Sequence, residues 1–517
     1  MKFFKRFLLI SLLCQGPIYC SSDFNFSGRS NIIRLQSGSN FIVGTELTGF
    51  NGKLIKDPNA TISGSNITFD QGSIEDNGNK FSLNCQFNPG SNQVVLDGEK
   101  TFKGKRGNIL SSLNVSGLNN RLEGQIQINS DIELQDQNTS VTCVVQGCVP
   151  CNFVLNGGTL FLEEDLKFVD DKFFSGSGVL KLNKRKLRLG SRELTCSSPL
   201  YFDEAQDIEL NSNFHLAETW TFSGESVIEG HGKILDFADA GEIVIERGSS
   251  LLMRGLVLEN VSENNIKCLD CCSTLSLQNV TWIQSGNYSF TIGAIEVVDK
   301  LCLKGNSTFA YQSAQTSTVW ANGKIVVDRG MTFSFDPIYN SNYSLTHDIA
   351  GTAINRWDWA RDFLCFEDGT AALELKGSTL HVTSTGLKIK KGTFRVREKS
   401  YITSELDGDF HIEEGFILGN NSSSDDARCE IDGGAILEVT SGAFSYKNMQ
   451  STSWLMFNDQ SKLSIANGGK LKLHQTLDVG DGIASFADGG RLARASGKSL
   501  EGSVHILGSV YYEICYN

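Results

Sequence analysis

The feature that most constrains this chain is a repeated pattern of two short apolar runs joined by a turn that contains glycine. From about Leu155 onward, apolar residues alternate with polar ones, as in Ile243 to Ile245 and, after Gly248, in Leu251 to Met253. Alternation with a period of two places the apolar side chains on one face of a strand. The pattern therefore predicts many short, half-buried β-strands. Further copies turn at Gly330, Gly377, Gly392, Gly442 and Gly468.

The length of the repeated region selects among the all-β architectures. Short strands form sandwiches, barrels or solenoids, but sandwiches and barrels usually end near roughly 250 residues. Here the pattern continues over 156–517 without a linker or a change of composition. We therefore predict an all-β fold in which 156–517 form a single-stranded parallel β-solenoid, with coils of roughly 20 to 25 residues and almost no helix. Residues 23–155 are less regular, and we interpret them as an N-terminal cap with the first coils or as a small β-domain.

The first 22 residues have the layout of a secretory signal peptide. Basic residues precede the apolar run Phe7–Cys14, which ends before Gly16 and Pro17. This run is too short to span a membrane, because a spanning helix needs about 20 apolar residues. We predict cleavage after Ser22, with cleavage after Cys20 as the alternative. The mature chain is then expected to be secreted or held at the cell surface, without a transmembrane segment.

The charge balance argues against one class of partner. The chain has 46 Lys and Arg residues against 59 Asp and Glu residues, which gives a formal net charge of −13. Nucleic-acid affinity depends on Lys and Arg side chains that neutralise phosphates. No nucleic-acid partner is therefore predicted.

Two clusters of cysteines are candidates for disulfides. The chain has 14 cysteines, and an even number remains when Cys14 and Cys20 leave with the signal peptide. Cys148 and Cys151 also have the two-residue spacing of a zinc-binding turn. However, neither cluster has a second pair at such a spacing, and export disfavours free thiolates. We predict disulfides or buried thiols, with no metal and no cofactor. The disulfide candidates are Cys143, Cys148, Cys151, Cys268, Cys271 and Cys272.

The segment Ile228–Asp236, followed by a strand, a glycine turn and a second strand, has the form of one coil of a known fold. In this segment and in the coil pattern of 156–517, the chain resembles the right-handed parallel β-helix of the pectin-lyase-like proteins and of bacterial surface or secreted passengers. The resemblance implies a right-handed solenoid. It does not select a function, because this fold hosts polysaccharide lyases, glycoside hydrolases, adhesins and phage tailspikes.

The catalytic motifs of the polygalacturonase-like hydrolases in this group are largely missing from the sequence. Those enzymes carry Asn-Thr-Asp, Asp-Asp, Gly-His-Gly and Arg-Ile-Lys, with one acid to protonate the leaving group and another to activate water. Only Gly230-His231-Gly232 matches, and we interpret His231 as the exposed middle of a turn. Asp425-Asp426 with Arg428 is interpreted as a loop rather than a lyase site. No catalytic residue is therefore predicted.

One stretch is a candidate for ligand binding. Asn355 to Asp362 is the densest charged and aromatic segment of the chain. Exposed Trp rings accompanied by Asp and Arg would suit stacking on a sugar ring, and the alternative is a long loop whose aromatic side chains cover the side of the solenoid. The candidate ligand-binding residues are Trp357, Asp358, Trp359 and Arg361.

The sequence leaves three functional hypotheses. The first is an exported, non-enzymatic β-helix protein whose side loops bind a host or environmental polysaccharide or a protein. The second is a polysaccharide lyase or glycoside hydrolase, which would need acids from different coils to converge on one face. The third is a surface protein that associates with itself through its coil ends or its flat strand faces.

Overall fold

The computed structural model describes the backbone of ten strands before residue 112 and most of the chain from residue 112 to residue 515. From 112 on, it leaves out 129–130, 146–147, 150, 169–171, 184, 190–191, 204–205, 238–239, 338–362, 384–385, 406–414, 420–426 and 448–454. Side chains are described from Val115 onward, except in these gaps and at 123–128, 145, 148–149, 455 and 515. The chain forms two compact units, one of 1–229 with 239–241 and one of 230–238 with 242–517.

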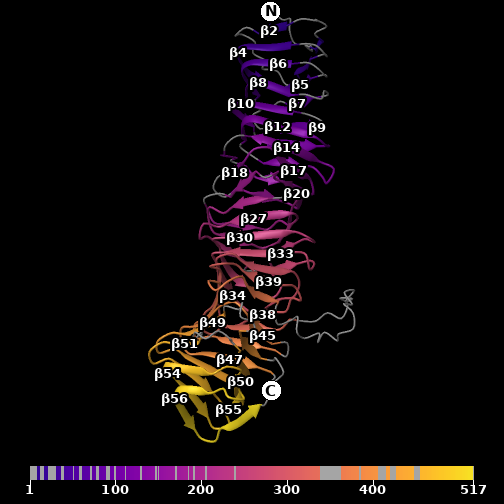
Figure 1. The fold of residues 1–517 in the computed structure, drawn as a ribbon. Helices are drawn as coiled ribbons and strands as arrows, with labels where there is room; N and C mark the ends of the chain where they lie inside the picture. The colour runs from indigo at the N-terminus through magenta and orange to yellow at the C-terminus, as the bar shows by residue number, and fades with distance from the viewer. Residues whose placement is uncertain are drawn as a thin grey trace, which may run out of the picture. The chain divides into compact units, whose positions relative to one another are not determined.

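The first unit is built from parallel strands that stack in chain order (Figure 1). One sheet has the order β1 (Leu9–Ser11), β3 (Asn31–Leu35), β5 (Gly52–Lys56), β7 (Ser73–Asp76), β9 (Gln93–Asp97), β11 (Ser112–Ser116), β13 (Ile132–Leu134), β16 (Phe153–Val154) and β19 (Phe174–Ser175). The next has the order β2 (Pro17–Cys20), β4 (Asn40–Phe50), β6 (Thr61–Phe69), β8 (Phe81–Asn88), β10 (Thr101–Leu110), β12 (Asn120–Ile128), β14 (Ser140–Val145), β17 (Thr159–Leu162), β20 (Gly178–Lys181), β23 (Leu200–Phe202) and β26 (Thr219–Phe222). Two shorter series are β15 (Cys148–Val149), β18 (Leu166–Phe168), β21 (Lys186–Arg188), β24 (Asp207–Glu209) and β27 (Glu225–Glu229), and β22 (Leu194–Cys196) with β25 (Phe214–Leu216).

The second unit repeats this construction. Its strands β29 (Glu242–Ile245) and β32 (Ile266–Cys268) pair, as do β30 (Ser250–Arg254), β33 (Thr274–Gln278), β36 (Ala294–Val297), β39 (Ser317–Val319) and β42 (Leu364–Phe366) in that order. A longer series is β28 (Ile234–Asp236), β31 (Val257–Val261), β34 (Val280–Gln284), β37 (Lys300–Lys304), β40 (Lys324–Val327), β43 (Ala372–Leu375), β46 (Gly392–Val396), β49 (Ala427–Ile431) and β51 (Leu455–Phe457). Another is β35 (Tyr288–Phe290), β38 (Thr308–Tyr311), β41 (Thr332–Phe335), β44 (Thr379–Val382), β47 (Ser400–Ser404), β50 (Ile436–Tyr446), β52 (Lys462–Ile465), β54 (Leu477–Ala487) and β56 (Leu500–Leu507). The strands β45 (Leu387–Ile389) and β48 (Phe416–Leu418) lead to β50, which also pairs with β53 (Gly469–Leu473), followed by β55 (Arg491–Ala495) and β57 (Tyr511–Cys515).

The described strands form a parallel β-solenoid of the right-handed type with about 15 turns. The sequence pattern predicts the parallel solenoid, and the resemblance implies its hand. Each strand pairs with the strand one coil later, so that Phe153 lies beside Phe174 and Lys186 beside Asp207. The described residues contain no helix, which confirms that expectation. The strand pairing also continues across residue 155, because β14 pairs with β17. Strands β1 and β2 lie within the predicted signal peptide, where the structure pairs them with β3 and β4.

The core consists of columns of inward side chains, one from each coil. In the first unit Leu160, Leu180, Phe202 and Phe222 follow one another in register, and all are completely buried. The rings of Phe202 and Phe222 stack with centroids 4.7 Å apart. Columns of this kind form because alternation places every second residue inside, and burying each such side chain stabilises the fold by about 1.5–3 kcal/mol. In the second unit the corresponding ring stacks are Phe309 with Phe333 and Tyr311 with Phe335.

Asparagines at the corners of the first unit fix successive coils to each other. Asn156 and Asn183 adopt the left-handed backbone conformation, with φ of 47° and 52°. Their side-chain amides donate to the carbonyls of Leu134 and Leu162 in the preceding coil, at 2.9 Å and 3.0 Å. Asparagine tolerates positive φ and hydrogen-bonds backbone locally, which explains its frequency at these turns.

Candidate functional site on one sheet of the second unit

The predicted ligand-binding residues Trp357, Asp358, Trp359 and Arg361 lie outside the described residues. The register of the flanking strands locates their segment in the chain. Val319 of β39 pairs with Phe366 of β42, so the two partners are about two coil lengths apart in sequence. The segment is thus an insertion into one coil of the second unit. Its role in ligand binding stays a prediction.

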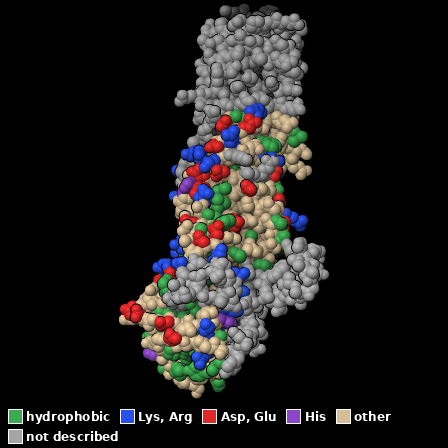
Figure 2. Space-filling view, in the orientation of Figure 1, with side chains coloured by type: hydrophobic (Ala, Val, Ile, Leu, Met, Phe, Trp, Pro, Cys, Tyr) green, Lys and Arg blue, Asp and Glu red, His purple; other side chains and the backbone are tan. Residues whose placement is uncertain are grey.

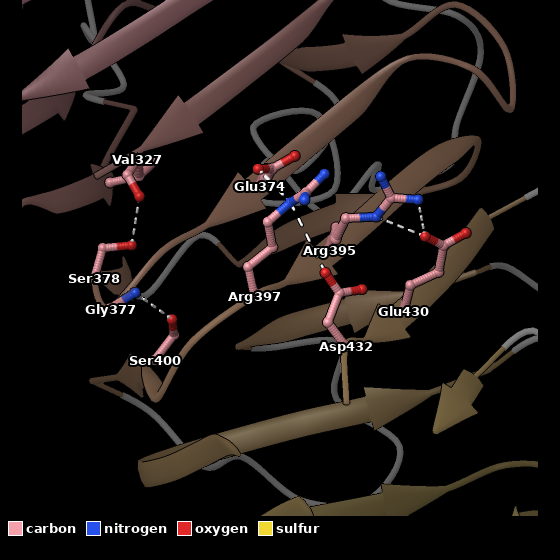
Figure 3. Close-up of polar contacts among 9 residues, drawn as sticks. All are labelled: Val327, Glu374, Gly377, Ser378, Arg395, Arg397, Ser400, Glu430 and Asp432. Atoms are coloured by element: carbon pink, nitrogen blue, oxygen red, sulfur yellow. Dashed lines mark hydrogen bonds and ion pairs between the residues drawn. The ribbon is translucent and has the colours of Figure 1, made fainter. Parts of the chain in front are cut away.

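The described residues hold a charged cluster on β43, β46 and β49, three strands that are neighbours in one sheet (Figure 3). Glu374, Arg395 and Glu430 occupy equivalent positions in three successive coils, because each pairs in register with the next. Arg397 and Asp432 lie two residues further along β46 and β49, just beyond the ends of these strands. Residues two apart in a strand point to the same face, so all five side chains share one surface of the sheet.

Arg397 joins two acids that come from different coils. Its Nε lies 2.6 Å from Oε1 of Glu374 and 3.9 Å from Oδ2 of Asp432. The Glu374 side chain is only 7% exposed, whereas that of Arg397 is 42% exposed. The guanidinium therefore covers a nearly buried carboxylate on one side and faces solvent on the other.

Arg395 forms the second ion pair of the cluster. Its Nε donates to Oε2 of Glu430 at 2.6 Å, and a terminal nitrogen contacts the same oxygen. Burial lowers the pKa of Arg395, but its hydrogen bond to Glu430 and the charges of Glu430, Asp432 and Glu374 outweigh burial and raise the pKa above its ordinary value. Arg395 is therefore a permanent cation at this site.

The neighbouring sheet adds a second set of polar contacts. Lys399 Nζ lies 3.0 Å from Oε2 of Glu438 and 5.2 Å from the centroid of the Tyr401 ring. The hydrogen bond and charge of Glu438 raise the pKa of Lys399. At the adjoining turn, Ser400 Oγ accepts from the backbone N–H of Gly377, and Ser378 Oγ donates to the carbonyl of Val327 (Figure 3). These bonds fix the coil edges beside the charged cluster.

The acids of the charged cluster contact the guanidinium groups of Arg395 and Arg397, and this pairing bears on what the cluster can do chemically. Hydrolysis of a glycosidic bond needs one protonated acid and one carboxylate able to activate water or attack the sugar. The contacts described here pair Glu374, Asp432 and Glu430 with guanidinium groups. Two guanidinium groups that are about 35% and 42% exposed add N–H donors suited to hydroxyl or carboxylate groups of a ligand.

The structure places the Gly-His-Gly motif as the sequence indicates. His231 lies in a turn between Gly230 and Gly232, is exposed, and adopts a positive φ of 50°. A Cβ at Gly230 would collide with the side chain of Leu256, which explains the glycine before it. Asp425 and Asp426 lie outside the described residues.

The predicted disulfide candidates fall into two different environments. Cys143 and Cys151 are buried, and burial raises the pKa of Cys151 to about 12, with smaller increases from Asp131 and Cys143. Cys148 lies in β15, where its side chain is not described. Cys268 is buried, Cys271 is partly exposed and Cys272 is exposed. Disulfide formation among these residues stays a prediction. Over the described residues, no group of three His, Cys, Asp or Glu side chains is placed to hold a metal ion.

The outer surface of the described residues differs between a charged face and the apolar last strands. Acidic and basic side chains lie intermixed over the described face in Figure 2. The last strands, β56 and β57, expose several large apolar side chains. Among the described residues, no helix is long and apolar enough to span a membrane. The exposed apolar residues are Ile506, Leu507, Tyr511, Tyr512 and Ile514.

Sequence reasoning missed the charged cluster. Its signals are the alternating charges of Arg395-Val396-Arg397 and Glu430-Ile431-Asp432, which become a pattern only when the two strands are known to be neighbours. Comparison with known proteins adds no assignment, because no protein-family model, no curated protein and no solved structure matches the chain.

Proposed function

We propose that this chain is an exported β-helix protein, secreted or held at the cell surface, that binds a polysaccharide or a protein without cleaving it. The proposal unites the signal-peptide layout of residues 1–22 with the solenoid and its inserted segment at 338–362. It extends the resemblance to pectin-lyase-like β-helix proteins of the surface passenger type. No metal or other cofactor forms part of it.

The observation that carries the proposal is the pairing of acids with arginines on β43, β46 and β49. A carboxylate held against a guanidinium is occupied by that contact, so it is poorly placed to give a proton to a leaving group. The same guanidinium groups, whose side chains are 35% and 42% exposed, carry N–H donors suited to hydroxyl and carboxylate groups. The surface thus favours recognition of a polar polymer over its hydrolysis.

A second candidate function, polysaccharide cleavage, is favoured by one observation. Glu374 and Asp432 come from coils on either side of β46 and meet at Arg397. This is the convergence of acids from different coils that a lyase or hydrolase on this fold requires. A ligand that displaced Arg397 would release both carboxylates for chemistry.

One experiment separates the two candidates. The purified chain is incubated with acidic and neutral polysaccharides, with and without calcium, while new reducing ends, unsaturated uronic ends and bound polymer are measured. We expect bound polymer without new ends. New ends that disappear in Glu374→Gln and Asp432→Asn would overturn the proposal in favour of the enzyme.

Variants locate the binding surface. Replacing both Trp357 and Trp359 by Ala is expected to reduce retention of the polymer at least tenfold, and Arg397→Gln to reduce it less. Trp320→Ala is the matched control, because Trp320 is an exposed Trp outside the candidate segment. If no polymer binds, the remaining binding partner is a protein, and the polysaccharide part of the proposal fails.

A further inference from the structure

Cys271 and Cys272 are consecutive cysteines in the turn between β32 and β33 of the second unit. Their Sγ atoms are 3.7 Å apart. Cys272 is exposed and Cys271 is partly exposed, whereas most other cysteines that the structure describes are buried. This turn is therefore the place in the described chain where two thiols are both adjacent and accessible to solvent.

The turn that carries the two thiols is held rigidly by its own coil and by the preceding one. Oδ1 of Asp270 accepts from the backbone N–H of Cys272 at 3.0 Å and from that of Gly248 at 3.2 Å. Ser273 Oγ lies 2.7 Å from the carbonyl oxygen of Glu246 and 2.8 Å from Oδ1 of Asp270. Because the backbone is fixed on both sides, the two thiols stay close together without a large loss of side-chain entropy on reaction.

We propose that Cys271 and Cys272 form a redox-active pair that closes to a vicinal disulfide on meeting a small disulfide oxidant. One thiol loses its proton and attacks the oxidant, which forms a mixed disulfide and releases the first thiolate of the oxidant. The neighbouring thiol then loses its proton and displaces the second thiolate. One S–S bond forms in the protein and one breaks in the oxidant, which leaves as two thiols.

The geometry makes this disulfide readily reversible. The Cα atoms of consecutive residues are about 3.80 Å apart, which is shorter than the roughly 4.4–6.8 Å usual for a disulfide. The closed ring is therefore strained, and strained disulfides are the more easily reduced ones. A pair of this kind suits a reversible modification rather than a permanent cross-link.

Cys268, three residues earlier, is a poor competitor. It is buried, and burial together with the charge of Asp270 raises the pKa of its thiol to about 12. The hydrogen bond with Cys271 also raises the pKa of Cys272, followed by the charges of Cys271 and Asp270. Closure should therefore accelerate as pH rises, because the thiolate is the attacking species.

The test uses the full chain in its reduced state. It is exposed to oxidised glutathione, quenched, alkylated and digested, and the peptide 268–300 is weighed. We expect this peptide to lose two hydrogens, carry no glutathione and retain one alkylated thiol at Cys268. Mild reductant should restore all three thiols.

Three variants make the assignment decisive. Cys271→Ser is expected to keep glutathione on Cys272, because no resolving thiol remains. Cys268→Ser and the control Cys365→Ser, at another partly exposed cysteine, should leave closure unchanged. Stable glutathione on the unmodified chain, three thiols that resist the oxidant, or loss of closure in Cys268→Ser would each overturn the proposal.

Discussion

Both units carry ion pairs on their outer faces between residues one coil apart. The two units differ in how far the paired side chains are buried. In the first unit Lys181 and Asp203 are 2.7 Å apart, and each side chain is 28% exposed. In the second unit Glu374 is 7% exposed beneath Arg397. An exposed pair contributes little to stability, whereas a carboxylate removed from water depends on its partner. Similar ion pairs on the two units therefore differ in how strongly the surrounding structure depends on them.

The cores of the two units differ in a related way. Trp220 and Trp282 are both completely buried. In the first unit Trp220 Nε1 donates to Sγ of Cys196 at 3.4 Å. In the second unit Trp282 Nε1 has no hydrogen-bond partner among the described residues. Among the described residues, the buried indole of Trp282 thus lacks the hydrogen bond that Trp220 makes, and an unsatisfied buried donor costs roughly 1–3 kcal/mol.

The largest expected effects come from these two tryptophans. Trp220→Ala and Trp282→Ala should each lower the free energy of unfolding by about 3–5 kcal/mol, because each leaves a large cavity. Trp282→Phe should cost less than Trp220→Phe, since it removes an unsatisfied donor instead of a bonded one. Denaturant unfolding with hydrogen exchange measured in each unit provides the test. Equal costs for the two Phe variants would contradict the difference between the cores.

The next largest effect is expected at the ion pairs that join successive coils on the outer faces of the two units. Arg397→Met should lower the free energy of unfolding by about 1–3 kcal/mol, because it leaves Glu374 poorly hydrated and without this cation. Arg188→Met is the matched control, since Arg188 pairs at 3.0 Å with Glu209, whose side chain is 20% exposed against 7% for Glu374, and it should cost about 0–1 kcal/mol. Hydrogen exchange in β43 and β49 against β21 and β24 measures both.

A double variant tests whether the buried charge of Glu374 causes the loss of stability. Adding Glu374→Gln to Arg397→Met should recover part of the loss, because the charge that needed compensation is gone. The same repair in the first unit, Glu209→Gln with Arg188→Met, should recover nothing measurable. Equal losses in the two units, or no recovery in the second, would mean that the exposure of the acid does not determine how much these ion pairs contribute to the free energy of unfolding.

The sequence predicts the solenoid but not the charged cluster, and the reason lies in coil length. Alternation and glycine turns are local, so strands such as Leu387–Ile389 can be recognised in isolation. The cluster depends on which strands are neighbours. β46 pairs with β49 although the chain between Val396 and Ala427 is longer than a regular coil. Without the register, Arg395 and Glu430 are two unrelated charged residues in the sequence.

The hydrogen bonds at the turns are likewise only partly predictable from the sequence. That Asn and Asp favour turns is evident from the sequence. The stacking of the coils determines whether such a side chain hydrogen-bonds to the preceding coil or within its own turn. Asn156 bonds to the carbonyl of Leu134, 22 residues earlier, whereas Asp368 bonds within its own turn. The paired cysteines at 271 and 272 are the opposite case, because their proximity is fixed by adjacency in sequence.

The smallest expected effect is a difference in how the stability of a turn depends on pH, compared between one turn in each unit. Asp368 Oδ1 accepts from the N–H and Oγ1 of Thr370, at 2.8 Å and 2.6 Å, and these bonds lower the pKa of Asp368 below 3.8. A carboxyl whose folded pKa is depressed contributes stability above its ordinary pKa and loses it as pH falls through the folded value. Asp368→Ala should therefore destabilise its turn at neutral pH and have no effect in strong acid.

The matched variant in the first unit is Asn156→Gly, which keeps the positive φ but removes the amide that donates to Leu134. It should cost about 0.5–1.5 kcal/mol, and the cost should be the same at every pH because an amide does not titrate. Hydrogen exchange of the two turns at pH 7 and in strong acid provides the measurement. A cost of Asp368→Ala that persists in acid would mean that the aspartate acts through its shape rather than its charge, and the two kinds of corner would then be equivalent.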